Sequence, residues 1–279
     1  MRKSKGNFIP ILAALLFFAG MAAIFVPPLT MNSEVARDEE AYAELRTRAK
    51  GDSVTEESSL PPTVSETAAT SAPPISVPST SGEGKTSVDI AACKAQNNDF
   101  VAWLQIPGTP IDYPVVSTDD TKYYLSHTFT GKKSYLGTLF SLGKTDYQLP
   151  SRNIAIYGHH IRSNDAVMFS PLLAYKDESY YADHELIHLD SLYHSGTYRI
   201  FAVLNMRSGD WEPSTTSFTS GADFLAFVNQ ARAQALYETD VEVTEADEIL
   251  TLITCDRRYQ PVLGRLVVMA VKEEPFKEE

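Results

Sequence analysis

Positive charge is scarce in this sequence. Its 279 residues carry 24 lysines and arginines against 36 aspartates and glutamates, which gives a formal net charge of -12. A nucleic-acid-binding surface needs a dense positive patch to neutralise phosphates, so this balance argues against a nucleic-acid partner. It leaves open which neutral or cationic partners the protein uses. The chain also shows no internal repeat.

Large apolar side chains are nearly absent from residues 53–86, which are rich in Ser, Thr, Pro and Glu. Such a segment cannot bury enough surface to offset the entropy lost on ordering it. The charged stretch before it, residues 33–50, fits a short solvated helix. We therefore expect residues 31–86 to form an extracytoplasmic linker, partly disordered, that holds a domain away from a membrane.

Charged residues are also missing from the mostly apolar run from Phe8 to Val26. At about 1.5 Å per residue, this run is close to the length of a bilayer core. Basic residues precede it and acidic residues dominate after it, so the positive-inside rule predicts a cytoplasmic N-terminus. Residues 1–30 are thus expected to form a cytoplasmic tip and a single-pass transmembrane helix. A cleaved signal peptide is the alternative, and both interpretations place the remaining chain outside the cell.

Residues 87–279 have the pattern of one globular domain, long enough for a substantial core. Strands are expected at 101–106, 111–116, 137–142, 153–158, 185–191, 197–204, 248–254 and 265–271. Helices are expected at 88–95 and 222–238, the second with Ser220 as a candidate N-cap. Because strands outnumber helices, the pattern favours a mostly antiparallel barrel or sandwich.

The stretch YADHELIH contains the pattern H-E-x-x-H, which on a helix places two histidines on one zinc ion. Here the motif runs into an alternation of apolar and polar residues that ends at Asp190 and is typical of a strand. In a strand, His184 and His188 would lie roughly 13 Å apart and could not share an ion. We therefore expect no metal and no other cofactor. A zinc metallopeptidase is kept as an alternative function.

Cysteine is limited to Cys93 and Cys255. An even count in an exported domain allows a disulfide, but Cys93 lies in the first expected helix among small apolar residues, where a buried free thiol is the expectation. Cys255 ends the strand TLITC, and Arg265 opens the next strand, so antiparallel pairing would make them neighbours. His159 follows the strand NIAIY through a glycine. A thiol, an imidazole and a guanidinium at strand ends on one rim suit nucleophilic acyl transfer.

These segments resemble the sortase family, and within it class B. The resemblance rests on TLITC, on the arginine ten residues later in GRLVVMA, and on IYGHH. Class B is indicated by NNDFVAWLQIPGTPIDYPVV, DTKYYLSHTF, YLGTLF and the helix at 222–238. The likeness covers nearly all of residues 88–271. It implies an eight-stranded β-barrel with a few peripheral helices, and a cysteine transpeptidase on the outer face of a Gram-positive cell membrane.

The resemblance also implies a reaction and its residues. The histidine, nucleophile and arginine of the family match His159, Cys255 and Arg265. The groove for the sorting peptide in class B enzymes matches Leu125, Ile253 and Thr254. The implied enzyme cleaves a sorting motif of a surface protein or pilin after its threonine and holds the acyl group as a thioester on Cys255. It then passes that group to an amine of a peptidoglycan precursor or of a lysine.

Two further points follow from the residues around this set. Thr121, Ile253 and the polar segment GTLFSLGKTD depart from the class B pattern, which leaves the preferred sorting motif open. His160, Arg257 and Arg258 are expected to flank the site rather than belong to it. A non-catalytic domain that uses a sortase-like barrel for surface binding is the remaining alternative, and the intact histidine, cysteine and arginine argue against it.

Overall fold

The computed structural model describes residues 28–51, 88–120, 122–148 and 151–273. The helices are α2 (Pro28–Ala49), α3 (Ile90–Gln96), the 3-10 helix η2 (Ser170–Lys176), α4 (Glu178–Asp183) and α5 (Gly221–Arg232). The strands are β1 (Phe100–Gln105), β2 (Asp112–Thr118), β3 (Leu139–Leu142), β4 (Asn153–Tyr157), β5 (Leu186–Ser191), β6 (Ser195–Arg207), β7 (Ile249–Cys255) and β8 (Gly264–Lys272). The expected transmembrane helix, residues 1–30, lies outside the described residues except for its last three positions. Within the described part of the chain, no helix combines the length and apolar composition of a membrane span.

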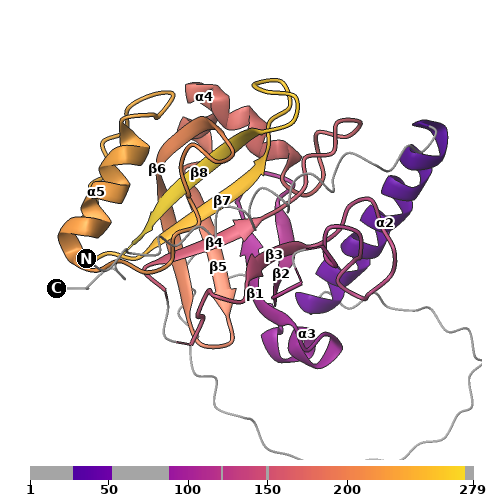
Figure 1. Cartoon of the computed structure of the whole chain (residues 1–279). Coiled ribbons are helices and arrows are strands. Elements are labelled where there is room, and N and C mark those ends of the chain that lie inside the picture. The colour runs from indigo at the N-terminus through magenta and orange to yellow at the C-terminus, as the bar shows by residue number, and fades with distance from the viewer. Residues whose placement is uncertain (1–27, 52–87, 121, 149–150, 274–279) are drawn as a thin grey trace, which may run out of the picture.

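The strands close into a barrel in the order β1-β2-β3-β4-β7-β8-β6-β5 (Figure 1). Neighbouring strands run antiparallel, except that β2 pairs with β3 and β4 pairs with β7 in parallel. The predicted eight-stranded, mostly antiparallel barrel is therefore confirmed. Each expected strand is present, with ends that differ by a few residues. Closure pairs every strand on both sides, which removes the exposed edges of an open sheet.

Strand β7 is buried on both of its faces. Leu250 and Leu252 belong to the main core cluster inside the barrel. Ile249 and Ile253 belong to a second cluster, in which the barrel wall packs against helix α5. Because successive side chains of a strand point to opposite faces, Cys255 lies on the same face as Ile253, away from the barrel interior.

Helix α5 is the amphipathic helix that the sequence predicts. Ser220 caps it, since its hydroxyl oxygen accepts a hydrogen bond from the Asp223 N–H at 3.1 Å. The helix ends at Arg232, before the predicted end, because the chain then turns back and the Leu236 N–H donates to the Val203 carbonyl of β6 at 2.7 Å. Figure 1 shows α5 and α2 on opposite sides of the barrel.

Helix α2 differs from the expected solvated helix within a linker. Four of its side chains, Val35, Tyr42, Leu45 and Ala49, are buried and belong to the main core cluster. The Tyr42 hydroxyl donates to the Gly137 carbonyl at 2.7 Å and accepts from the Phe129 N–H at 3.2 Å. The prediction of a solvated helix was wrong. It rested on the mostly charged and polar composition of the segment, but one apolar stripe along a helix is enough to dock it on a core. The folded unit that contains the barrel therefore includes α2.

We expect Tyr42→Phe to lower the free energy of unfolding by about 1–3 kcal/mol, because it removes a buried hydroxyl and leaves the Phe129 N–H without an acceptor. The check is urea unfolding of the chain that includes α2. Tyr193→Phe is the matched control, since Tyr193 is 54% exposed and its loss should change stability by less than about 0.5 kcal/mol. Equal stability of the two variants would show that α2 does not dock through Tyr42.

Candidate active site

Three neighbouring strands bring His159, Cys255 and Arg265 to one end of the barrel. The parallel pairing of β4 with β7 runs as far as Tyr157 opposite Ile253. The Gly158 N–H then donates to the Ile253 carbonyl at 3.2 Å, so His159 follows β4 at the end of the barrel where Cys255 ends β7. In the antiparallel pair of β7 and β8, Cys255 lies opposite Arg265, which confirms the predicted neighbourhood of these two residues. The three residues thus form a row across adjacent strands, which we call the catalytic row.

Cys255 is the central member of the row, and it is 7% exposed. Burial raises the pKa of its thiol, whereas the positive charges of Arg265 and Arg257 lower that pKa and Asp256 raises it. The net direction is upward. The free protein at neutral pH therefore carries a thiol here, and a base must take its proton before the sulfur can attack a carbonyl carbon.

His159 is held by the segment between β2 and β3. Its Nε2 lies 2.8 Å from the Leu125 carbonyl oxygen. Since a carbonyl only accepts, Nε2 carries the proton, and Nδ1 is the basic nitrogen of the neutral ring. Burial lowers the pKa of this imidazole by more than the hydrogen bond to Leu125 raises it. A neutral imidazole of fixed tautomer is a suitable base for the thiol.

Gly137 allows this close approach between His159 and its supporting segment. Its φ is +61°, and a Cβ at this position would lie 2.4 Å from the Tyr124 carbonyl oxygen and 3.1 Å from His159 Cδ2. The Gly137 carbonyl also accepts a hydrogen bond from the Tyr42 hydroxyl of α2. Helix α2 therefore supports the segment that orients the histidine.

Arg265 places a buried cation next to the thiol. It is 3% exposed, and its Nη1 donates to the Gly264 carbonyl at 2.7 Å. Burial lowers the pKa of the guanidinium, but the ordinary value is so far above neutrality that the group stays charged. A fixed positive charge at this position can stabilise a thiolate or a developing oxyanion.

The three residues predicted to line a peptide groove lie in different surroundings. Leu125 is half-buried, and its carbonyl contacts His159. Ile253 shares a face of β7 with Cys255 but packs into the cluster beneath α5. Thr254 points to the opposite face, is 2% exposed, and donates its hydroxyl to the Gly158 carbonyl at 2.9 Å. The structure thus brings Leu125 to the row, whereas the Thr254 side chain holds the end of β4 against β7.

Asp256 organises the chain directly after the nucleophile, a role that the sequence reasoning did not assign. Its buried carboxylate accepts hydrogen bonds from the N–H groups of Arg258 at 3.0 Å and Tyr259 at 3.2 Å. Its other oxygen pairs with Lys176 of η2. An aspartate that begins a turn commonly bonds to the backbone N–H two residues later, which is the sequence signal for this role.

The H-E-x-x-H motif crosses from the end of α4 into β5, as the alternation predicted. His184 is the C-cap of α4, and its Nδ1 lies 2.9 Å from the Tyr180 carbonyl oxygen. His188 lies in β5, with Nδ1 at 3.1 Å from the Thr197 hydroxyl. The motif is not helical, so it does not form the zinc site that the pattern suggests. Among the described residues, no three His, Cys, Asp or Glu side chains are grouped to hold a metal ion.

Cys93 and Cys255 are not joined in a disulfide, and both are thiols. Cys93 lies in α3 and is 2% exposed. Burial raises the pKa of its thiol to about 11, so it reacts slowly with electrophiles at neutral pH. Cys255 is therefore the cysteine that lies opposite a cation, at the barrel end where His159 follows β4.

Comparisons with known proteins point to one family. The family model described as the sortase domain matches residues 104–273. The sortase B of Listeria monocytogenes is 30% identical over 189 residues, which cover 68% of this chain and 76% of that protein. A solved sortase B of Clostridium perfringens is 30% identical, with a TM-score of 0.61, covering 66% of this chain and 99% of the other. The Staphylococcus aureus sortase B–substrate complex shares the fold, with a TM-score of 0.68 at 23% identity, covering 87% of this chain and 99% of that one.

Proposed function

This chain belongs to the sortase family, whose members are cysteine transpeptidases, and we propose that it joins surface proteins or pilins to an amine through a thioester on Cys255. The observation that carries this proposal is the catalytic row, in which a thiol lies between an imidazole and a guanidinium on adjacent strands. The Staphylococcus aureus relative was solved as a substrate complex, which supports a donor groove for a sorting motif near the row.

In the first half-reaction, the Cys255 thiol gives its proton to Nδ1 of His159, and the sulfur attacks the threonine carbonyl carbon of the sorting motif. A C–S bond forms, and the carbonyl electron pair moves onto oxygen. When the tetrahedral intermediate collapses, the C=O bond is restored and the C–N bond breaks. His159 then protonates the leaving amine. The products are a thioester on Cys255 and the free C-terminal fragment.

In the second half-reaction, an incoming amine attacks the thioester carbonyl and loses a proton to His159. The C–S bond then breaks, and the sulfur leaves as a thiolate that recovers the proton from the imidazolium. The new amide joins the donor to a peptidoglycan precursor or to a lysine of a pilin. Arg265 stabilises the oxyanion of both tetrahedral intermediates through its positive charge. Neither half-reaction needs a cofactor.

We place the enzyme at the cell surface. Residues 1–30 are proposed to anchor it in the membrane with a cytoplasmic N-terminus, and the remaining chain is proposed to be extracellular. The catalytic unit consists of residues 87–279 together with α2. Residues 52–86, which lie outside the described residues, are proposed to be the connecting linker.

The pH dependence of thioester formation follows from the two opposite pKa shifts. Burial raises the pKa of Cys255 and lowers that of His159, so between those values the pair holds one proton, mostly on sulfur. The reactive thiolate–imidazolium form is a fixed minor fraction of that state. We expect a kcat/KM that is flat around neutral pH. It falls at acid pH, where the pair gains a second proton, and at alkaline pH, where the pair loses its last one. The two shifts place both declines farther from neutrality than the ordinary pKa values of an imidazole and a thiol.

Alkylation of Cys255 by iodoacetamide tests the same assignment, because it requires only the thiolate. Its rate should keep rising at the alkaline pH values where thioester formation declines. An alkylation rate that is already maximal at neutral pH would mean that the thiolate is the resting state, contrary to the raised pKa of Cys255.

The proposed function is tested by comparing a thiol reagent with a chelator. Iodoacetamide should label Cys255 and abolish cleavage of sorting-motif peptides of the LPxTG or NPxTN type, whereas exhaustive chelation should leave cleavage unchanged. Peptide mapping identifies the labelled cysteine, and metal analysis accompanies the assay. Stoichiometric zinc together with inactivation by the chelator would reverse the assignment in favour of a metallopeptidase.

A further inference from the structure

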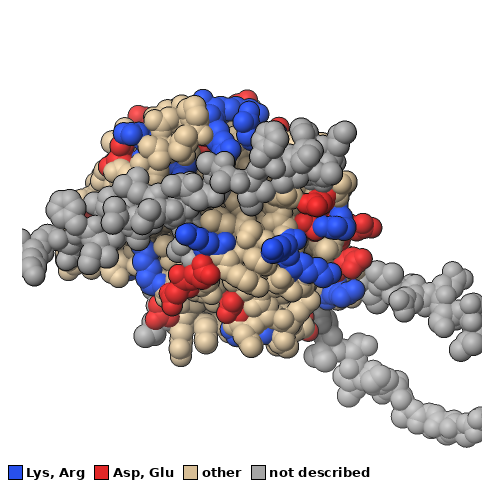
Figure 2. All heavy atoms as spheres, turned by 45° about the vertical axis from the view of Figure 1, so that its right-hand side comes forward, with Lys and Arg blue, Asp and Glu red and all other residues tan. Residues whose placement is uncertain are grey.

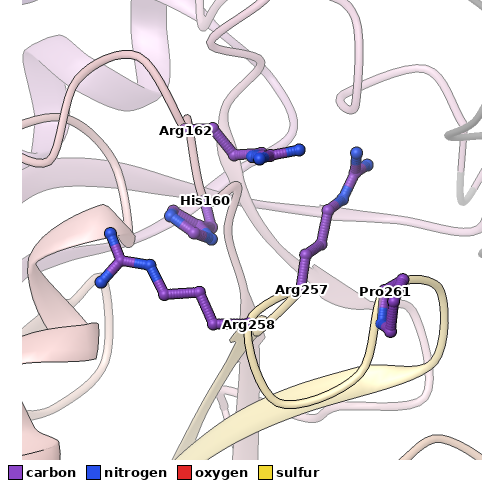
Figure 3. A pocket seen from close by; sticks show the side chains of 5 residues that line it. All are labelled: His160, Arg162, Arg257, Arg258 and Pro261. Atoms are coloured by element: carbon purple, nitrogen blue, oxygen red, sulfur yellow. The ribbon is translucent and has the colours of Figure 1, made fainter.

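A cavity of about 390 Å³ lies next to the catalytic row and is lined by His160, Arg162, Arg257, Arg258 and Pro261 (Figure 3). Three of these residues are permanently cationic, and none is acidic. On the face shown in Figure 2, by contrast, Lys and Arg side chains lie beside Asp and Glu side chains in several places. A lining with three arginines and no acidic side chain is unexpected in a chain with a net charge of -12. We call this cavity the cationic pocket.

The pocket arginines lack the carboxylate partners that several arginines elsewhere have. Arg46 pairs with Glu39, and Arg199 pairs with Glu185 and Glu273. None of the three pocket arginines forms a salt bridge with a carboxylate among the described residues. Each guanidinium presents five N–H donors in a planar fork that matches carboxylate and phosphate oxygens.

The backbone that carries two of these arginines is fixed by hydrogen bonds. Asp256 accepts the Arg258 N–H through its side chain and the Gln260 N–H through its carbonyl, at 3.0 and 3.1 Å. The Gly264 N–H then donates to the Gln260 carbonyl at 3.1 Å. These bonds fix the backbone positions from which the exposed side chains of Arg257 and Arg258 extend.

His160 adds a second indication of a ligand. Its Nδ1 lies 3.0 Å from the Cys255 carbonyl oxygen, and its Nε2 is buried without a hydrogen-bond partner among the described residues. Because a carbonyl only accepts, Nδ1 carries the proton, and Nε2 of the neutral ring can only accept a hydrogen bond. This buried nitrogen costs free energy until a water or an N–H group of a ligand donates to it. Asp165 and Asp256 both act electrostatically on His160, but Asp256 is already paired with Lys176. Arg258 acts on the pKa of His160 in the direction opposite to these carboxylates.

The two consecutive histidines point to different neighbours. His159 faces the Leu125 carbonyl, on the side proposed for the donor peptide. His160 faces the Cys255 carbonyl and lines the cationic pocket. In the view of Figure 3, Arg162 and Arg257 lie on one side of the His160 ring and Arg258 extends to the other. The pocket thus adjoins Cys255 on a different side from Leu125. The donor peptide is proposed to lie on the Leu125 side, so the pocket is accessible to the second substrate, the amine acceptor.

We propose that the cationic pocket binds an anionic group, a carboxylate or a phosphate, of the amine acceptor. The inference rests on the proposed function, since the acceptor is the substrate that enters after the thioester has formed. The bound anion makes no covalent bond. It positions the acceptor so that its amine reaches the thioester on Cys255, which raises the effective concentration of the nucleophile.

The test is competition between matched acceptors for one pool of thioester. The phosphate pair is Gly-Gly-phosphoserine amide against Gly-Gly-Ser amide, and the carboxylate pair is Gly-Gly-Glu amide against Gly-Gly-Gln amide. The ratio of the two products cancels any effect on thioester formation. We expect the parent protein to favour at least one anionic acceptor by about tenfold, the factor that one charge-assisted hydrogen bond provides.

The double variant Arg162→Gln/Arg258→Gln should bring that ratio close to one. Arg257 is left in place because its charge also acts on the pKa of Cys255. Arg207→Gln is the matched control, since Arg207 is an exposed arginine that pairs with Asp210 instead, and it should keep the parental ratio. A parental ratio of one for both pairs, or a preference that survives in the double variant, overturns the proposal. The proposal is also overturned if the double variant changes the preference for the donor peptide and leaves the preference for the acceptor unchanged.

A binding measurement separates this proposal from the proposed function. Calorimetric titration of the Cys255→Ala protein with the phosphoserine peptide needs no catalysis. It should show saturable binding that the double variant weakens by about tenfold. Binding no tighter than that of the serine peptide overturns the pocket assignment. A parent protein that forms no thioester with any sorting peptide contradicts the proposed function instead, whatever the titration shows.

Discussion

Replacing Arg265 with lysine is expected to slow thioester formation by about a hundredfold or more, the usual loss when one positioned oxyanion donor is removed. Lysine keeps the positive charge and most of the stem, but one ammonium cannot present two parallel donors to an oxyanion or a peptide carbonyl. Arg265 is 3% exposed and lies opposite Cys255, so no solvent replaces the lost donors. Single-turnover acylation by a sorting-motif peptide measures the effect.

The alternative role for Arg265 is to cover apolar surface with its stem, in which case lysine would replace it with little loss. A melting curve should therefore lie near that of the parent, and Cys255 should still react with iodoacetamide. Arg199→Lys makes the same chemical change at the other end of the β6–β8 pair, where Arg199 lies opposite Val271, and should leave acylation unchanged. Near-parental acylation by Arg265→Lys would show that Arg265 is structural.

His159→Asn should reduce thioester formation by about 10²–10⁴-fold, the usual contribution of a general acid–base group. Asparagine can donate a hydrogen bond, but it can neither take the thiol proton nor protonate the leaving amine. Since burial raises the pKa of Cys255, the thiol does not ionise at neutral pH without a base. Alkylation of Cys255 at alkaline pH should persist, because hydroxide then removes the proton.

His188→Asn is the matched control for His159→Asn. His188 lies in β5 and contacts Thr197, and it would be a zinc ligand if the H-E-x-x-H motif were functional. We expect near-parental thioester formation from this variant. If His188→Asn lost as much activity as His159→Asn, the motif would carry chemistry that its strand geometry does not allow.

The strands and the catalytic row were largely predictable because they rest on local patterns. The buried strand that ends at Cys255, the connection that leads to Arg265 and the glycine before His159 are all visible in the sequence. Antiparallel pairing of consecutive strands then predicts that Cys255 and Arg265 are neighbours. The parallel pairing of β4 with β7, which brings His159 alongside, joins strands that are far apart in the chain, and no local pattern specifies it.

The docking of α2 on the barrel was not predicted, because the charged composition of residues 33–50 hides the helical spacing of their apolar side chains. Val35, Tyr42, Leu45 and Ala49 are spaced by seven, three and four residues, which is the spacing of one helical face. The charged residues between them dominate the composition of the segment and hide that stripe. Its partner surface, the Gly137 segment, is formed only in the folded barrel.

The cationic pocket also could not be predicted from the sequence. Adjacent arginines after a strand usually face water, so the sequence suggests only a solvated loop for Arg257 and Arg258. Arg162 comes from a separate segment, and only the fold places it on the same cavity as His160. The sequence pattern therefore indicated the nucleophile but not the surface that adjoins it.

The most direct test of the thioester mechanism is the intact mass of the protein after mixing with sorting-motif peptides in the absence of an amine acceptor. We expect one acyl adduct, mapped to Cys255, that hydroxylamine releases and that Cys255→Ala does not form. Cleavage of the peptide by Cys255→Ala at the parental rate, or an adduct on Cys93 in place of Cys255, would contradict the mechanism.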